Sequence, residues 1–331
     1  MTTMTDILPT KTHRGENFPV ASALIHPRHR EIILAFYRFA RASDDIADHP
    51  SLPENEKLTR LQRMEDTLLG RDDISAEAIP LRAALAKRGL APRHAQDLLT
   101  AFRMDVTKRR YRDWDDLIGY CTYSAMPVGR FVLDVHGESR ATWPANDALC
   151  AALQVINHLQ DCGADYRRLD RVYIPLDALD RHGLTVGALA AEKASPELRQ
   201  CLQDLAQRTS ALLRDAEPFS AQISDLRLGL EVSIIHRLAL KLVAILNARD
   251  PLSERVHLNA PEVAATSAVG AAGALGRRIA RQFAAGNNGR QLWDGRGRCR
   301  HNHRKRGEAR LGELVLYRHA VVAAAAAPGS V

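Results

Sequence analysis

Hydrophobic residues recur every three or four positions through most of this chain, with polar residues between them. That period places the apolar side chains on one face of an α-helix. Runs of β-branched residues are short, and prolines and glycines interrupt the pattern at intervals. The pattern therefore predicts an all-α protein, with helices over residues 29–48, 53–70, 79–90, 91–109, 113–137, 143–170, 195–219 and 225–251.

The first predicted helix contains three aspartates in an Ala-rich stretch, YRFARASDDIADH. At about 100° per residue, Arg41, Asp44 and Asp48 share one narrow face with Tyr37, and Asp45 lies at its edge. Like charges one turn apart destabilise an isolated helix. A solvated acidic stripe neutralised by Arg41 is one interpretation. Apolar residues flank the aspartates, however, which is unusual for an exposed surface.

A second predicted helix carries a similar face. Gln154, Asn157, Asp161 and Asp165 fall within about 80° of one another around the helix axis. Carboxylate and amide oxygens suit Mg²⁺, which keeps several waters and pairs with substrate phosphates. Two such helices facing each other would hold several Mg²⁺ ions and a diphosphate between them. The metal would then relieve the repulsion between the aspartates.

The composition favours one large helical domain in a reducing compartment. The chain has 331 residues, 46% of them hydrophobic, and five cysteines without a CxxC pair. The net charge of +7 comes mainly from residues 286–331, where nine Lys and Arg face three Asp and Glu. A nucleic-acid partner is therefore not expected. No signal peptide is apparent, so we expect a cytoplasmic protein that at most lies on the inner face of the cell membrane.

Changes in composition along the chain predict three segments. Residues 1–14 form an N-terminal extension, and residues 15–260 form the helical domain. Residues 261–331 are Ala- and Gly-rich and then basic, and we expect a loose, disordered tail there.

Four stretches of the sequence resemble the squalene and phytoene synthase family. They are ENFPVAS, AFYRFARASDDIADH, YSAMPVGRFVLDVHG and NHLQDCGADYRRLDRVYIP, and they are most similar to the hydroxysqualene synthase branch of bacterial hopanoid biosynthesis. The resemblance extends from about Arg14 to His257. It implies a single-domain helical bundle of the isoprenoid (terpenoid) synthase type with a central apolar cavity.

The resemblance also implies roles for individual residues. It gives the metal ligands as Asp44, Asp45, Asp48, Asn157, Asp161 and Asp165. It gives the catalytic residues as Asp44, Asp48, Asp161, Asp165 and Tyr173, and the substrate-binding residues as Arg41, Gln154, Asn157 and Arg255. Tyr37 is added to the substrate-binding residues because its helical phase places it on the aspartate-bearing face.

The activity implied by the resemblance is that of a Mg²⁺-dependent carbon–oxygen lyase. It would ionise presqualene diphosphate and capture the cation with water, giving hydroxysqualene and diphosphate. One alternative is a prenyltransferase that condenses prenyl diphosphates head to head to presqualene diphosphate, squalene or phytoene. Glu16 and Asn17 disfavour it, because condensing relatives carry small hydroxyl or basic residues there. An alternative of another class is a non-catalytic helical scaffold that binds metal or lipid.

Further expectations concern cofactors and partners. Several Mg²⁺ ions are expected and NADPH is not. Association with a membrane surface would help to release a lipid product, and presqualene diphosphate could be channelled from the enzyme that makes it.

Overall fold

The computed structural model of the protein describes residues 26–288, which form helices and connecting loops with no named strand. The predicted all-α class is confirmed. The α-helices are α1 (Pro27–Ala47), α2 (Glu54–Leu68), α3 (Ala78–Arg88), α4 (Arg93–Thr107), α5 (Trp114–Ser124), α6 (Met126–His136), α7 (Trp143–Leu169), α8 (Leu176–Arg181), α9 (Pro196–Asp215), α10 (Phe219–Gln222), α11 (Leu226–Ala248) and α12 (Ala260–Asn288). Short 3₁₀ helices span Arg140–Thr142 and Val186–Ala190.

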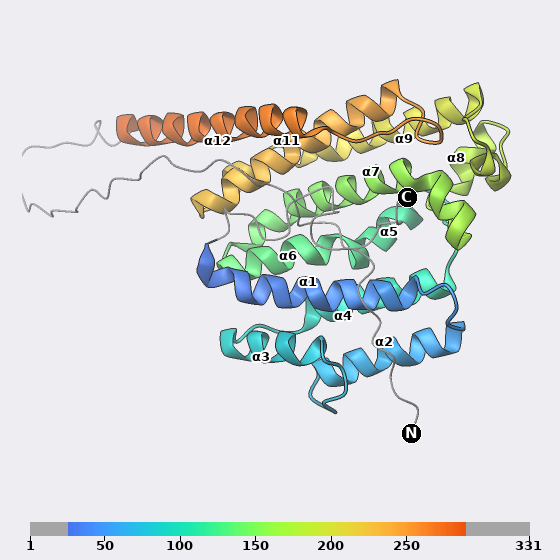
Figure 1. Cartoon of the computed structure of the whole chain (residues 1–331). Helices are drawn as coiled ribbons and strands as arrows, with labels where there is room; N and C mark the ends of the chain where they lie inside the picture. The colour runs from blue at the N-terminus through green and yellow to red at the C-terminus, as the bar shows by residue number, and fades with distance from the viewer. Residues whose placement is uncertain (1–25, 289–331) are drawn as a thin grey trace, which may run out of the picture.

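The helices are stacked in layers around α7 (Figure 1). One apolar core forms where α1 packs with α2, α3 and α4, and includes Phe39, Leu61 and Leu99. A second core forms around α7, α9 and α11. The rings of Phe36 and Phe131 stack with centroids 3.9 Å apart, which joins α6 to α1 within this first core. The helix α1 therefore lies between α2, α3 and α4 on one side and α6 and α7 on the other.

Capping residues explain several helix boundaries. The side chains of Asp113, Ser195 and Asp225 accept hydrogen bonds from backbone N–H groups in the first turns of α5, α9 and α11. The helices α3 and α6 end at Gly89 and Gly137, both left-handed. These signals are local in sequence, and the predicted helices were accordingly placed within a few residues of the observed ones.

The predicted helix 113–137 is two helices in the structure. It breaks at Ala125, and Pro127 lies in the first turn of α6, where a missing N–H costs nothing. Gly129 allows α6 to approach α7 closely. A Cβ atom at this position would overlap the side-chain oxygen of Asn146 and lie 2.7 Å from Cys150 Sγ. The structure therefore has both a break between α5 and α6 and a close contact between α6 and α7.

We expect Gly129→Ala to lower the free energy of unfolding by about 1–3 kcal/mol, because the added methyl group has no room between α6 and α7. Urea denaturation measures the change. Gly119→Ala is the matched control, since Gly119 is in α5 with no atom within 4 Å of an added Cβ. It should be neutral or stabilise by up to ~1 kcal/mol. Equal effects of the two substitutions would contradict the close approach.

The Ala- and Gly-rich segment after residue 260 is helical, so the prediction of a loose tail is wrong as far as residue 288. The helix α12 packs along α11, and Gly270 lies against the backbone of Ser233 and Ile234. The Ser233 hydroxyl donates to the Gly270 carbonyl at 2.9 Å. Small residues on α12 let its backbone pack directly against the backbone of α11, so large apolar side chains are not needed at this contact. Residues 1–14 and the tail beyond residue 288 lie outside the described residues.

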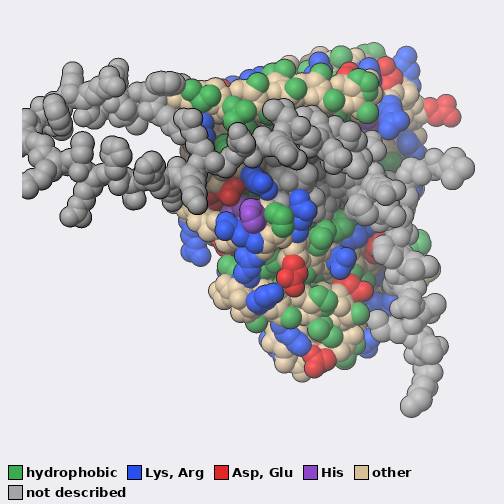
Figure 2. Space-filling view, turned by 60° about the vertical axis from the view of Figure 1, so that its left-hand side comes forward, with side chains coloured by type: hydrophobic (Ala, Val, Ile, Leu, Met, Phe, Trp, Pro, Cys, Tyr) green, Lys and Arg blue, Asp and Glu red, His purple; other side chains and the backbone are tan. Residues whose placement is uncertain are grey.

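The outer side of α12 is exposed and largely apolar. No charged residue occurs between Glu262 and Arg277, and Val269, Leu275 and Ile279 are exposed. In Figure 2, hydrophobic side chains lie among uncharged atoms over much of the upper part of the molecule, with Lys, Arg, Asp and Glu at its top and right-hand margins and on the part below. Among residues 26–288, no helix is long and apolar enough to cross a membrane.

Candidate active site

Two arginines form ion pairs with the aspartates on one face of α1. Arg41 Nη1 lies 2.8 Å from Asp44 Oδ2, and Arg41 Nη2 lies 2.7 Å from Asp45 Oδ1. The side chains of Arg41 and Asp44 are only 8% and 5% exposed, so this pair is not the solvated surface pair considered above. Asp48, which caps the C-terminus of α1, pairs with Arg171. Arginines therefore relieve part of the repulsion between these aspartates.

The corresponding face of α7 is nearly closed to solvent. Gln154, Asn157 and Asp165 are buried, and Asp161 is half-buried. Asn157 Oδ1 and Asp165 Oδ2 are buried oxygens that accept no hydrogen bond from residues 26–288. A buried oxygen without a donor is costly, so it favours a bound cation or donor at this place.

The two faces lie close enough for their charges to interact. Burial raises the pKa of Asp44 well above its usual value; the Asp48 charge adds to this rise and Arg41 opposes it. Burial likewise raises the pKa of Asp165, followed by the charges of Asp161 and of Asp48 on the other helix. The structure therefore brings together the aspartates of α1 and α7, as their helical phases predict.

A fifth carboxylate, Asp105 on α4, joins this group and was not found from the sequence. It accepts hydrogen bonds from Tyr173 at 2.8 Å and from Tyr120 at 2.9 Å. Burial raises the pKa of Asp105 to about 6, against the opposing charge of Arg171. The term acidic cluster is used below for five residues, Asp44, Asp48, Asp105, Asp161 and Asp165. Only tertiary structure reveals Asp105, because no second acidic residue lies one turn away on α4.

Arg171 is the second residue that the sequence did not indicate. It is buried and joins the end of α7 to the end of α1, donating to Asp48 and, at 3.1 Å, to the Ala47 carbonyl. Its position directly before the tyrosine-containing stretch VYIP was the only available signal. Arg171 thus places one positive charge inside the acidic cluster.

The raised pKa of Asp105 predicts an unusual pH dependence of stability in metal-free buffer. A carboxyl whose folded pKa is above its unfolded value of 3.8 stabilises the fold at low pH, and this contribution is lost as pH rises through about 6. Asp105→Asn removes that titration. Relative to the unaltered protein, the variant should gain about 1.4 kcal/mol between pH 5 and pH 8. Urea denaturation at both pH values, with a chelator present, measures it; a difference that does not change with pH would contradict the prediction.

A histidine and an amide continue the polar face of α7. The His158 ring stacks on the Tyr173 ring with centroids 3.6 Å apart, and Gln154 Nε2 lies 3.0 Å from His158 Nε2. Burial, and then the charge of Arg171, lowers the pKa of His158 to about 3. A neutral His158 therefore accepts the proton of the Gln154 amide and fixes the orientation of that amide. Tyr173 is fixed between His158 and Asp105.

The remaining predicted residues lie at different distances from this group. Tyr37 is half-buried on α1. Arg255 follows α11 and is exposed. The next residue, Val256, is held against α7, where its carbonyl accepts from Gln160. Glu16 and Asn17 lie outside the described residues.

A divalent cation fits the chemistry of the acidic cluster. The group supplies carboxylates with mutual repulsion and buried oxygens without donors, as hard cations require. Within residues 26–288, however, no three His, Cys, Asp or Glu side chains converge into a ready metal site. In this structure Arg41 and Arg171 instead pair with two carboxylates of the acidic cluster, Asp44 and Asp48, and Arg41 also pairs with Asp45.

Solved structures with the same architecture define the class of protein. A squalene synthase from Alicyclobacillus acidocaldarius superposes with a TM-score of 0.61 at 29% identity, covering 69% of this chain and 86% of that one. A dehydrosqualene synthase in complex with a ligand has the same fold, with a TM-score of 0.62 at 20% identity, covering 75% and 88% of the two chains. The fold is therefore a helical bundle of the isoprenoid synthase type.

The family model for squalene/phytoene synthase matches residues 11–262, and the chain belongs to this family. A hydroxysqualene synthase of Rhodopseudomonas palustris is 62% identical over 258 residues, which cover 78% of this chain and 88% of that protein. A hydroxysqualene synthase of Zymomonas mobilis is 52% identical, over 80% of this chain and 90% of that protein. The family resemblance inferred from the sequence is thereby confirmed.

Proposed function

We propose that this enzyme ionises presqualene diphosphate and captures the resulting carbocation with water, releasing hydroxysqualene and diphosphate. The observation that carries the proposal is the 62% identity to a hydroxysqualene synthase over 88% of the length of that protein. The meeting of two acidic helix faces beside buried arginines supports it. A silent scaffold has no need of such costly buried charges.

The reaction requires a diphosphate to leave, so the main task of the site is to neutralise charge on the departing oxygens. Mg²⁺ held by Asp44, Asp48, Asp161 and Asp165, with Asp45 and Asn157 beside them, would supply Lewis-acid neutralisation of the diphosphate. Arg41 would exchange its present aspartate contacts for diphosphate oxygens, which an arginine fork binds strongly.

Other residues would orient the site and keep water out. Arg171 fixes the position of Asp48 through their ion pair, and Asp105 accepts a hydrogen bond from the Tyr173 hydroxyl. We assign Gln154 and Asn157 to the wall of the same site, where His158 fixes the Gln154 amide. The apolar residues around α7 and α11 would cover the hydrocarbon and exclude all but the reacting water.

Incubation with two substrates tests the proposal. With Mg²⁺ present, the purified enzyme should convert presqualene diphosphate to hydroxysqualene and should leave farnesyl diphosphate unchanged, as read by mass spectrometry. Conversion of farnesyl diphosphate to a C30 or longer-chain condensation product would instead support the head-to-head condensing alternative. No conversion of either substrate would support a non-catalytic role.

A further inference from the structure

The helix α12 carries large apolar side chains on its outer side. A typical surface helix buries its large apolar residues and exposes polar ones. On α12, Gly270 is buried against the backbone of α11, and Gly273 and Ala274 are half-buried. Val269 and Leu275, in contrast, are 58% and 43% exposed. The usual arrangement of a surface helix is therefore reversed along this part of α12.

The exposed side of α12 forms one continuous apolar surface. Every exposed residue from Ala264 to Gly276 is Ala, Val, Leu or Gly, and the exposed Ile279 follows Leu275 by one turn. The term outer ridge is used below for Val269, Leu275 and Ile279 with the exposed Ala and Gly residues between them and Ala264. The helix lies on the outside of the bundle, next to α11 and across from α2 and α3 (Figure 1). A contiguous apolar surface of this kind indicates a partner that removes it from water.

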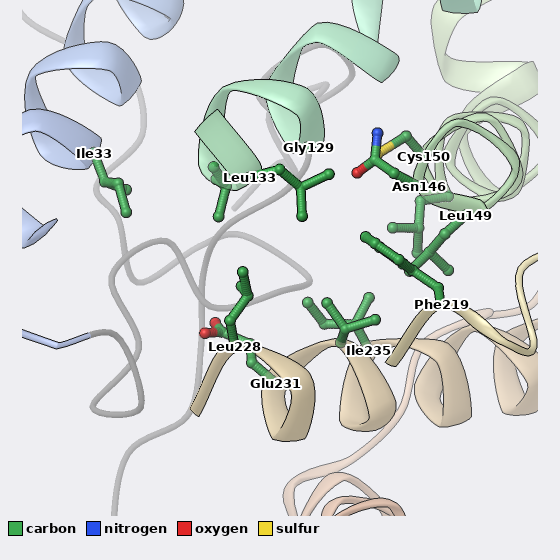
Figure 3. A pocket seen from close by; sticks show the side chains of 13 residues that line it. Ile33, Gly129, Leu133, Asn146, Leu149, Cys150, Phe219, Leu228, Glu231 and Ile235 are labelled. Carbon is green, nitrogen blue, oxygen red and sulfur yellow. The ribbon is translucent and has the colours of Figure 1, made fainter. Parts of the chain in front are cut away.

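The outward side of α11 places basic residues beside this ridge. Leu228 and Ile235 line an apolar cavity of about 50 Å³ on the inner side of α11 (Figure 3). At 100° per residue, Arg237 lies about 180° from Leu228 around the helix axis. Arg237 and Lys241 follow Ser233 at intervals of four residues, and Ser233 is hydrogen-bonded to α12. Both basic side chains are exposed, so they lie beside α12 on the outside of the bundle.

The charge around the outer ridge is positive. Every exposed charged residue of α11 is basic, namely Arg227, Arg237 and Lys241. Arg278, at the end of the outer ridge, is exposed as well. The term basic rim is used below for these four residues. The one acidic residue of α12, Glu262, is half-buried in its first turn. Helices that bind a bilayer interface combine an apolar face with Lys and Arg in the same way.

We propose that the protein docks on the surface of an anionic phospholipid bilayer through the outer ridge of α12, with the basic rim against the lipid phosphates. The aliphatic ridge would enter the boundary between headgroups and acyl chains, where its area is removed from water. The phosphates would pair with the arginines and the lysine of the basic rim. The helix would lie in the interface, since no helix within residues 26–288 is long and apolar enough to span a bilayer.

A second copy of the chain fits the same surface less well. An isologous contact between two α12 helices would bring the basic rims of both copies together, and like charges at an interface repel. A bilayer that contains anionic lipid supplies the opposite charge. The inference does not depend on which substrate the enzyme converts, so its failure and the failure of the proposed function are separate results.

Vesicle flotation of the full chain tests the apolar part of the surface. The unaltered protein should float with vesicles of phosphatidylcholine and phosphatidylglycerol. We expect Leu275→Glu and Ile279→Glu each to lower the affinity by about tenfold or more, because each removes buried apolar area and adds a negative charge. Ile74→Glu is the matched control. Ile74 is 54% exposed, close to the 51% of Ile279, but it lies between α2 and α3 on the other side of the bundle, so its replacement should leave the affinity unchanged.

The same assay tests the basic rim. Arg237→Gln and Lys241→Gln should each lower the affinity for these vesicles by about fivefold, the contribution of one basic residue near an anionic surface. Their effect should disappear on vesicles of phosphatidylcholine alone. Lys87→Gln is the control, since Lys87 is 70% exposed on α3, away from α12, and it should have no effect.

Three results would overturn the inference. They are no flotation of the unaltered protein, equal flotation of the Leu275, Ile279 and Ile74 variants, and a dimer without vesicle binding that Ile279→Glu dissociates. The last result, read by analytical ultracentrifugation, would make the outer ridge a contact between copies of this chain. Circular dichroism checks that each variant keeps its helix content. If Ile279→Glu does not, flotation of Ile279→Gln decides.

Discussion

Turnover of presqualene diphosphate is expected to fall by about 10²-fold or more when asparagine replaces Asp44 or Asp161. Asp44 lies on α1 and Asp161 on α7, on the two faces that meet in the acidic cluster. An amide supplies no negative charge to hold a cation beside the diphosphate. The Mg²⁺ concentration required for half-maximal rate should therefore rise in both variants, and steady-state kinetics across a Mg²⁺ titration measures both effects.

Asp73→Asn is the control for these substitutions. Asp73 is exposed in the loop between α2 and α3, and its partner Arg82 is half-buried on α3. Its replacement should change neither turnover nor the Mg²⁺ requirement. If Asp44→Asn and Asp161→Asn behaved like Asp73→Asn, the aspartates would be a structural feature and the assigned metal-binding role would be wrong.

Arg171→Leu should lower the free energy of unfolding by about 3–5 kcal/mol in metal-free buffer at pH 8. Removing one partner from a buried ion pair leaves the other charges uncompensated, which costs about this much. Here the substitution leaves Asp48, Asp105 and Asp165 without the positive charge that opposes their repulsion. Urea denaturation measures the loss, and added Mg²⁺ should restore part of it.

Arg109→Leu is the matched control for Arg171→Leu. Arg109 pairs with Glu54 and Asp170, but it is about half exposed. Pairs of this kind contribute at most about 1 kcal/mol. Similar losses for the two variants would contradict the inference that Arg171 neutralises the acidic cluster.

The parts of the fold that could be predicted depend on local signals. Apolar periodicity and capping residues such as Asp113 and Ser195 are read within one turn of helix, so most helices were predicted within a few residues. The division of 113–137 into α5 and α6 depends on how Pro127 and Gly129 meet α7. The helix α12 was missed because its packing on α11 relies on small residues, which resemble a loose segment in a sequence.

The candidate site divides in the same way. Helical phase alone places Asp44 and Asp48 on one face of α1, and the structure brings that face to Asp165. The Arg171 pair joins residues 123 positions apart in sequence, and no periodicity reports such a contact. Asp105 was missed for the same reason, since its tyrosine partners come from α5 and from the segment after α7.

The most direct test of the account is the origin of the product's oxygen. The enzyme is incubated with presqualene diphosphate and Mg²⁺ in H₂¹⁸O, and the C30 product is analysed by mass spectrometry. The account predicts hydroxysqualene carrying ¹⁸O on carbon. The released diphosphate should keep the unlabelled ester oxygen that joined it to carbon in the substrate. Unlabelled hydroxysqualene, or a hydrocarbon product without oxygen, would contradict ionisation followed by water capture.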